Sequence, residues 1–147
     1  MTSTDIENVV RIGRGEAPGL AAEEYRRLAA LAEQLSPEEW GHSTDCPGWT
    51  VRDVLAHVAG AMAGTSLREG SRQRKVAGQR SESSGRTFLD EMNQLQIEER
   101  ADLTKVALAR ELRARIQPAV RARRRVPALL RRGRSTGDGL LATAVVF

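Results

Sequence analysis

The stretch Cys46–Gly60, which reads CPGWTVRDVLAHVAG, contains the start of a helix and one of the two histidines of the chain. Thr50 and Asp53 have the spacing of a capping box, in which each side chain accepts a hydrogen bond from the other residue's backbone amide. Apolar residues then recur with helical period, at Val51, Val54, Leu55, Val58 and Met62. His57 lies at the margin of this stripe. We therefore expect its imidazole to point into a cleft beside the core.

Two patterns precede this helix. Leucines at near-helical spacing predict a first helix from Leu20 to Leu35, with glutamates and arginines on its outer side. The following SPEEW predicts a separate helical turn, because Ser36 and Glu39 again form a capping box and Pro37 occupies the first helical position.

Two further helices are predicted towards the other end of the chain. The first covers about residues 87–101, with Phe88, Met92 and Leu95 on its buried side. The second starts after Thr104 and keeps its period through Leu108, Leu112 and Ile116. Pro118 is expected to kink or end that helix. A short basic segment with a break at Pro127 is expected over residues 119–132.

The segments between and before these helices are predicted from composition. Residues 64–85 are rich in serine, glycine, arginine and glutamine, so we expect a long, mobile crossover that is helical only at its start. Residues 1–18 are predicted to be a flexible lead-in, and residues 19–147 to form one domain. Because neither strand alternation nor a repeat appears, the fold class is predicted to be all-α.

The composition is that of a globular protein, with 40% hydrophobic and 29% charged residues. There is one cysteine, no recognisable signal peptide, and no apolar run of the roughly 18–20 residues that span a bilayer. We therefore expect a cytoplasmic protein without a membrane partner. Residues 112–147 contain nine arginines and a single acid, Asp138. A block of seven of them could bind phosphate backbones: Arg121, Arg123, Arg124, Arg125, Arg131, Arg132 and Arg134. Without interleaved aromatics, a solvated helix face is favoured over a nucleic-acid site.

The residues alone leave the chemistry open. A lone histidine at a helix margin is more often structural than a metal ligand, so both roles remain for His57. Cys46 could be a nucleophile with His57 as its base, but a cysteine before a proline in a turn is more often a small packed residue.

Several of these segments together resemble a known family. LSPEEW followed by CPGWTVRDVLAHVAG is similar to the N-terminal signature of the mycothiol-dependent maleylpyruvate isomerase family, which is related to the DinB-like metal-binding bundles. The similarity continues through FLDEMNQLQIEERADLT and RARRRVPALLRR, so it covers roughly residues 19–134.

The resemblance implies a four-helix up-down bundle with a long crossover and a divalent metal, most often zinc, near one end. It places the first metal ligand at His57. It also implies mycothiol as the thiol cosubstrate and a small electrophile as the partner, giving isomerisation or S-transfer. On the helix predicted over residues 87–101, Asn93 and Gln96 are expected to line the cofactor pocket. The catalytic residues are not identified.

The chain departs from the family pattern after the arginines. The family continues into a fourth helix with an acid-x-x-x-His pair, and no such pair occurs before Phe147. The sequence thus predicts an incomplete last helix and only one of three ligands, which puts catalytic activity of the 147-residue chain in doubt. The alternatives are a non-catalytic fragment and a basic, nucleic-acid-binding or regulatory module. An exposed apolar groove would also allow a homodimer.

Overall fold

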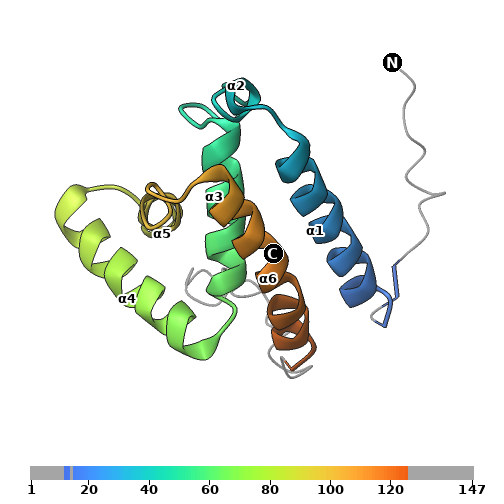
Figure 1. The fold of residues 1–147 in the computed structure, drawn as a ribbon. Coiled ribbons are helices and arrows are strands. Elements are labelled where there is room, and N and C mark those ends of the chain that lie inside the picture. The colour runs from blue at the N-terminus through green and yellow to red at the C-terminus, as the bar shows by residue number, and fades with distance from the viewer. Residues whose placement is uncertain (1–11, 14, 126–147) are drawn as a thin grey trace, which may run out of the picture.

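The computed structural model describes residues 12–13 and 15–125. All regular structure in these residues is helical, which confirms the all-α class (Figure 1). The helices are α1 (Ala17–Gln34), α2 (Pro37–Trp40), α3 (Val51–Ala63), α4 (Leu67–Ser84), α5 (Phe88–Glu98) and α6 (Lys105–Arg125). Most of the lead-in predicted over residues 1–18, the break predicted at Pro127 and the predicted incomplete last helix lie outside the described residues.

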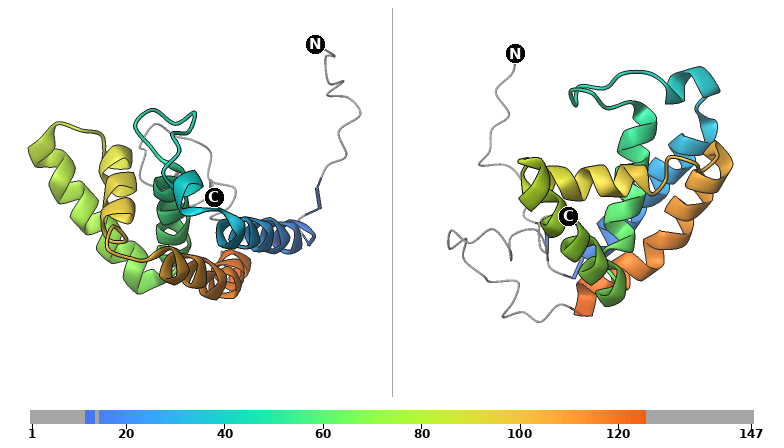
Figure 2. Two further views of the ribbon diagram at one scale, coloured as in Figure 1. Left: turned by 45° about the horizontal axis from the view of Figure 1, so that its top comes forward. Right: turned by 90° about the vertical axis from the view of Figure 1, so that its left-hand side faces the viewer.

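The helices form two groups that share α3. Helix α6 packs against both α1 and α3, and these three helices enclose the apolar core. Helix α5 packs against α3, and α4 packs mainly against α5, so the pair lies to one side of the core (Figures 1 and 2). The up-down order of a four-helix bundle stays a prediction.

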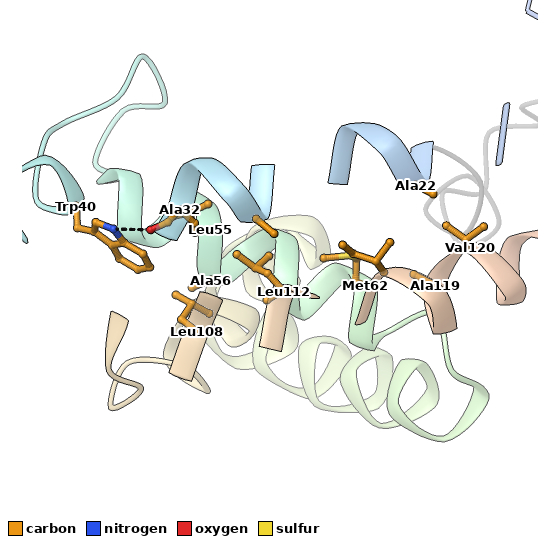
Figure 3. Close-up of a cluster of buried hydrophobic side chains, with 13 residues drawn as sticks. Ala22, Ala32, Trp40, Leu55, Ala56, Met62, Leu108, Leu112, Ala119 and Val120 are labelled. Carbon is orange, nitrogen blue, oxygen red and sulfur yellow. Dashed lines mark hydrogen bonds between the residues drawn. The ribbon is translucent and has the colours of Figure 1, made fainter. Parts of the chain in front are cut away.

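The core is built from alanine, leucine and a few larger residues (Figure 3). Leu108 and Leu112 of α6 are fully buried, and each such leucine stabilises the fold by about 1.5–3 kcal/mol relative to an exposed one. Trp40 ends the short helix α2 and is buried; its Nε1 donates a hydrogen bond to the carbonyl oxygen of Ala32 over 3.3 Å. That bond satisfies the indole N–H inside the apolar cluster.

The buried face of α1 differs from the expected one. Its buried residues are the alanines Ala22, Ala29 and Ala32, whereas Leu20 and Leu31 are about half exposed. The small side chains allow the backbones of α1 and α6 to approach closely. The predicted leucine stripe therefore contributes only its other two members, Leu28 and Leu35, which are partly buried against the core.

The helix starts predicted after Ser36, Thr50 and Thr104 are confirmed, whereas α1 begins at Ala17, three residues before the predicted Leu20. Both capping boxes form, at Ser36 with Glu39 and at Thr50 with Asp53. The Thr50 amide donates to Asp53 Oδ2 over 2.8 Å, and the Asp53 amide donates to Thr50 Oγ1 over 3.3 Å. Thr104 likewise precedes α6 and accepts a hydrogen bond from a backbone amide of its first turn. These contacts satisfy amides that a helix start otherwise leaves without a partner.

The mobile crossover predicted over residues 64–85 is wrong, because α4 is a regular helix of 18 residues. Ser66 caps its start, and Gly85 ends it with a φ of 72°, a left-handed conformation that favours glycine. The buried positions of α4 are Gly70, Gln73 and Ala77. A helix that packs through small and polar residues lacks the apolar period on which the prediction depended.

Of the two outcomes expected at Pro118, a kink or an end of the helix, the end is wrong, since α6 continues to Arg125. Proline removes one amide donor from the helix interior, which destabilises it. Buried residues on both sides of Pro118, among them Ile116 and Val120, pack into the core and hold the helix in place.

Candidate functional site at His57

His57 lies near the middle of α3, a helix that packs against α6 and also against α5. Its side chain is half-buried. The imidazole packs against the indole of Trp49, with ring centroids 5.2 Å apart and the planes tilted by 56°. Trp49 directly precedes the capping residue Thr50, so the same turn that starts α3 also positions the aromatic wall of the site.

Helix α5 supplies the opposite wall through Gln96, which is 5% exposed and whose side chain lies close enough to the imidazole to raise the pKa of His57. The two helices come unusually close at Gly60. A β-carbon added there would lie 2.6 Å from the Gln96 β-carbon, so only glycine allows this approach.

A second glutamine continues the contact from α5 to α4. Gln96 Nε2 donates to Gln73 Oε1 over 3.3 Å, and Gln73 Nε2 donates to the carbonyl oxygen of Gly60 over 3.2 Å. Gln73 Nε2 also donates to Glu69 Oε1 over 3.2 Å. Gln73 is 2% exposed, so these bonds satisfy an amide that would be costly to bury alone.

Charged residues surround this amide pair. Arg100 is buried, with Nη1 donating to the Gln96 carbonyl oxygen over 3.0 Å and Nη2 donating to Glu111 Oε1 over 2.9 Å. On the outer side, Arg72 contacts Glu69, and this hydrogen bond lowers the pKa of the Glu69 carboxyl below its usual range. Glu69 is therefore an ionised acceptor at neutral pH.

The end of α5 is attached to α3 by one arginine. Arg52 Nη2 donates to three backbone carbonyl oxygens, at 2.9 Å from Arg100, 2.7 Å from Ala101 and 2.7 Å from Leu103. Because Arg52 precedes His57 by five residues on α3, this clamp fixes α5 and its Gln96 relative to the imidazole.

The electrostatic setting of His57 favours the neutral ring. Burial lowers the pKa of the imidazole below its ordinary 6.5, and the Gln96 side chain offsets part of this effect. At neutral pH the ring thus carries a lone pair on one nitrogen. A lone pair is what a metal ligand or a proton acceptor needs.

The sequence profile described as mycothiol maleylpyruvate isomerase N-terminal domain matches residues 21–146. The chain belongs to this family. The match includes all of α2 to α6 and therefore the whole His57 site. Searches of curated proteins and of solved structures gave no match. In the described part of the chain, every helix is too short or too polar to cross a membrane.

The metal site expected from the sequence resemblance is not completed by the described residues. A catalytic zinc ion needs three protein ligands and an open position. Among residues 12–13 and 15–125, no three His, Cys, Asp or Glu side chains converge as a group that could hold a metal ion. His42 and Cys46 are exposed in the loop before α3.

The structure places the two predicted pocket residues differently. Gln96 contacts His57, as described above, whereas Asn93 is half-buried one helical turn earlier on α5. Their predicted role in cofactor binding stays a prediction. Sequence reasoning missed the roles of Gln73, Gly60 and Arg100, because each acts through a partner on another helix.

The arginines of α6 are partly engaged within the molecule. Arg113 pairs with Glu33 of α1 over 2.5 Å, and the Arg123 guanidinium lies 5.7 Å from the Tyr25 ring centroid. A hollow of about 330 Å³ opens between α1 and α6, beside Glu33 and Arg113. This hollow is lined by residues of α1 and α6, so it is separate from the His57 site. We favour the His57 site as the functional one, because it contains the imidazole and the buried amides.

Proposed function

We propose that this chain is a domain of a mycothiol-using isomerase or S-transferase, with a small electrophile as the substrate. The observation that carries the proposal is the half-buried imidazole of His57, held between Trp49 and Gln96 in a family whose described name refers to mycothiol and maleylpyruvate. An imidazole nitrogen with a lone pair suits zinc, so His57 is proposed as one zinc ligand. Use of an intracellular thiol would place this activity in the cytoplasm.

The remaining zinc ligands are proposed to come from outside the described residues, either from the rest of the polypeptide or from a second copy of the chain. This follows from the ligand count, since His57 is one ligand and a catalytic zinc site needs three. A homodimer that shares the site would make the zinc content depend on the state of association.

The alternative of a basic nucleic-acid-binding module is less well supported. Of the arginines predicted to bind phosphate, Arg123 contacts Tyr25 inside the molecule, and the neighbouring Arg113 and Arg115 form ion pairs with Glu33 and Glu111. Arginines that are engaged in this way are less available to phosphate groups.

The first experiment is metal analysis by mass spectrometry of the purified chain, of His57→Ala and of His42→Ala. We expect about one zinc per chain, or about one per dimer, in the first and third proteins and little in the second. His42 is the matched control, because it is the other histidine and its side chain is exposed in a loop.

Thiol consumption with mycothiol and maleylpyruvate, measured on the same three proteins, then tests the reaction. Turnover that His57→Ala loses and His42→Ala keeps would support the proposal. Absence of zinc from all three proteins would contradict the metal-dependent function, and zinc that persists in His57→Ala would contradict the role of His57.

A further inference from the structure

The hollow between α1 and α6 combines an apolar surface with charged side chains. Its apolar part consists of Ala109, which is 3% exposed, and Val106, which is 64% exposed. The other lining residues are charged, and long charged side chains also contribute apolar stems to such a surface. With a volume of about 330 Å³, the hollow lies at the lower end of the range of small-molecule sites. It is therefore large enough for the apolar body of a small organic molecule.

The charges around the hollow do not balance. Three of the four charged lining residues are cations, namely Lys105, Arg110 and Arg113, and the only acid is Glu33. Arg113 bonds both carboxylate oxygens of Glu33, over 2.6 Å and 2.5 Å. This pair between α1 and α6 uses the acid completely. Two cations of the lining remain without a counter-charge.

Neither remaining cation forms an ion pair with a residue that the structure describes. Lys105 Nζ lies 5.9 Å from the ring centroid of Trp40, and the carboxylate of Glu38 acts on it only through space. Arg110 is exposed, and its guanidinium has no partner among the described residues. Its five N–H donors are thus available to a ligand.

The rest of α6 does not neutralise Arg110. The only acid of this helix is Glu111, which bonds Arg100 over 2.9 Å and also pairs with Arg115. Arg113 lies three residues after Arg110 and is a neighbour on the helix surface, where like charges destabilise a helix slightly. An anion bound in the hollow would offset this repulsion.

We infer that the hollow binds a small organic anion. Its apolar body would lie against Val106 and Ala109, and its carboxylate or sulfonate group would be held by Arg110 and Lys105. Charge complementarity selects an anion, because a neutral or cationic molecule would leave both cations without a counter-charge. A guanidinium can also bond such a group through two N–H donors at once. The hollow shares no residue with the His57 site, so the inference does not depend on the proposed function.

The test compares two fluorescent probes in titrations of the purified chain. Anilinonaphthalenesulfonate is an aromatic anion that binds apolar surfaces, and phenylnaphthylamine has the same aromatic body without the charge. We expect the anion to bind about fivefold more tightly at low salt and to lose most of this advantage at high salt. Amide shifts in ¹H–¹⁵N spectra locate the bound probe and should be largest at Val106, Ala109 and Arg110.

Arg110→Glu should weaken binding of the anion by about five- to tenfold, because an attraction is replaced by a repulsion. It should leave the affinity for the neutral probe unchanged. The matched control is Arg121→Glu, at an exposed position about three helical turns further along the same side of α6 and outside the hollow. This variant should change the affinity by less than twofold. Both arginines are exposed, so neither substitution should disturb the fold.

Equal affinities for the two probes would overturn the inference, because the hollow would then be an apolar surface without selectivity for charge. An Arg110→Glu variant that behaves like Arg121→Glu would overturn it as well, and so would amide shifts confined to other parts of the chain. Failure of the anion to bind would also contradict it, and self-association through the same amides would then assign the hollow to a second copy of the chain. The zinc measurements on His57→Ala bear on none of these outcomes, so the two proposals can fail separately.

Discussion

The two sides of α3 are held in different ways. One side packs Leu55, Ala59 and Met62 into the apolar core with α1 and α6. The other side presents His57 and Gly60 to buried polar residues of α4 and α5. The apolar side is stabilised by contacts that depend on volume and have no direction. The polar side is stabilised by hydrogen bonds between particular atoms, each of which has a definite donor and acceptor.

This difference shows why the candidate site lies where it does. An apolar core excludes water but offers no group that can bind a ligand or hold a proton. The layer between α3, α4 and α5 is nearly as dry, since Gln73, Gln96 and Arg100 are each less than a tenth exposed, yet it contains amides and charges. Hydrogen bonds in such a layer are stronger than in water.

The apolar side is expected to show the largest effect on substitution. Leu112→Ala removes a 1% exposed side chain from the buried face of α6 and should lower the free energy of unfolding by about 2–5 kcal/mol. Denaturant titration followed by circular dichroism measures it. Leu31→Ala on α1 is the matched control, because this leucine is 51% exposed and its loss should change the free energy of unfolding by about 0.5 kcal/mol or less. Equal effects of the two substitutions would mean that the core does not lie between α1, α3 and α6.

On the polar side, a glycine-to-alanine substitution is expected to lower the free energy of unfolding, although such a substitution inside a helix usually raises it. Alanine normally stabilises a helix interior relative to glycine, by roughly 0.5–1 kcal/mol. Gly60→Ala should instead lower the free energy of unfolding by about 1–3 kcal/mol, because the new β-carbon overlaps Gln96 and α5 must move.

Gly78→Ala is the control for this substitution. Gly78 lies inside α4, and an added β-carbon there meets no atom within 4 Å. It should therefore raise the free energy of unfolding by about 0.5–1 kcal/mol. The same denaturant titration measures both variants, and a stabilised Gly60→Ala would show that α3 and α5 are not in close contact at this point.

The same contrast explains how much could be predicted from the sequence. The starts of α2, α3, α5 and α6 follow from local signals, such as the capping box at Thr50 and Asp53, which depend on residues three apart. The core leucines of α6 follow from helical period. These features are local, so one segment of sequence contains the information.

The polar side could not be predicted in the same way. Gln73 has no role that its neighbours in sequence reveal; its partners are Gly60, thirteen residues earlier, and Gln96, twenty-three residues later. Helix α4 itself was predicted to be mobile, because its buried face has glycine, glutamine and alanine where an apolar stripe would be expected. His57 was recognised through the family signature, and its contacts with Trp49 and Gln96 required the three-dimensional structure.

The smallest expected effect is a pH dependence that belongs to the polar side alone. The pKa of His57 is lowered by burial, so below its ordinary 6.5 the unfolded chain takes up a proton before the folded chain does. The free energy of unfolding should therefore fall as the pH falls below 6.5. A second decline should follow below 4.5, where the carboxyl of Glu69, whose pKa is lowered chiefly by Arg72, must be protonated in turn. Denaturant titrations across this range should show that His57→Gln loses the first decline and Glu69→Gln reduces the second. His42→Gln should keep both declines, and a first decline that survives in His57→Gln would assign it to a group outside this site.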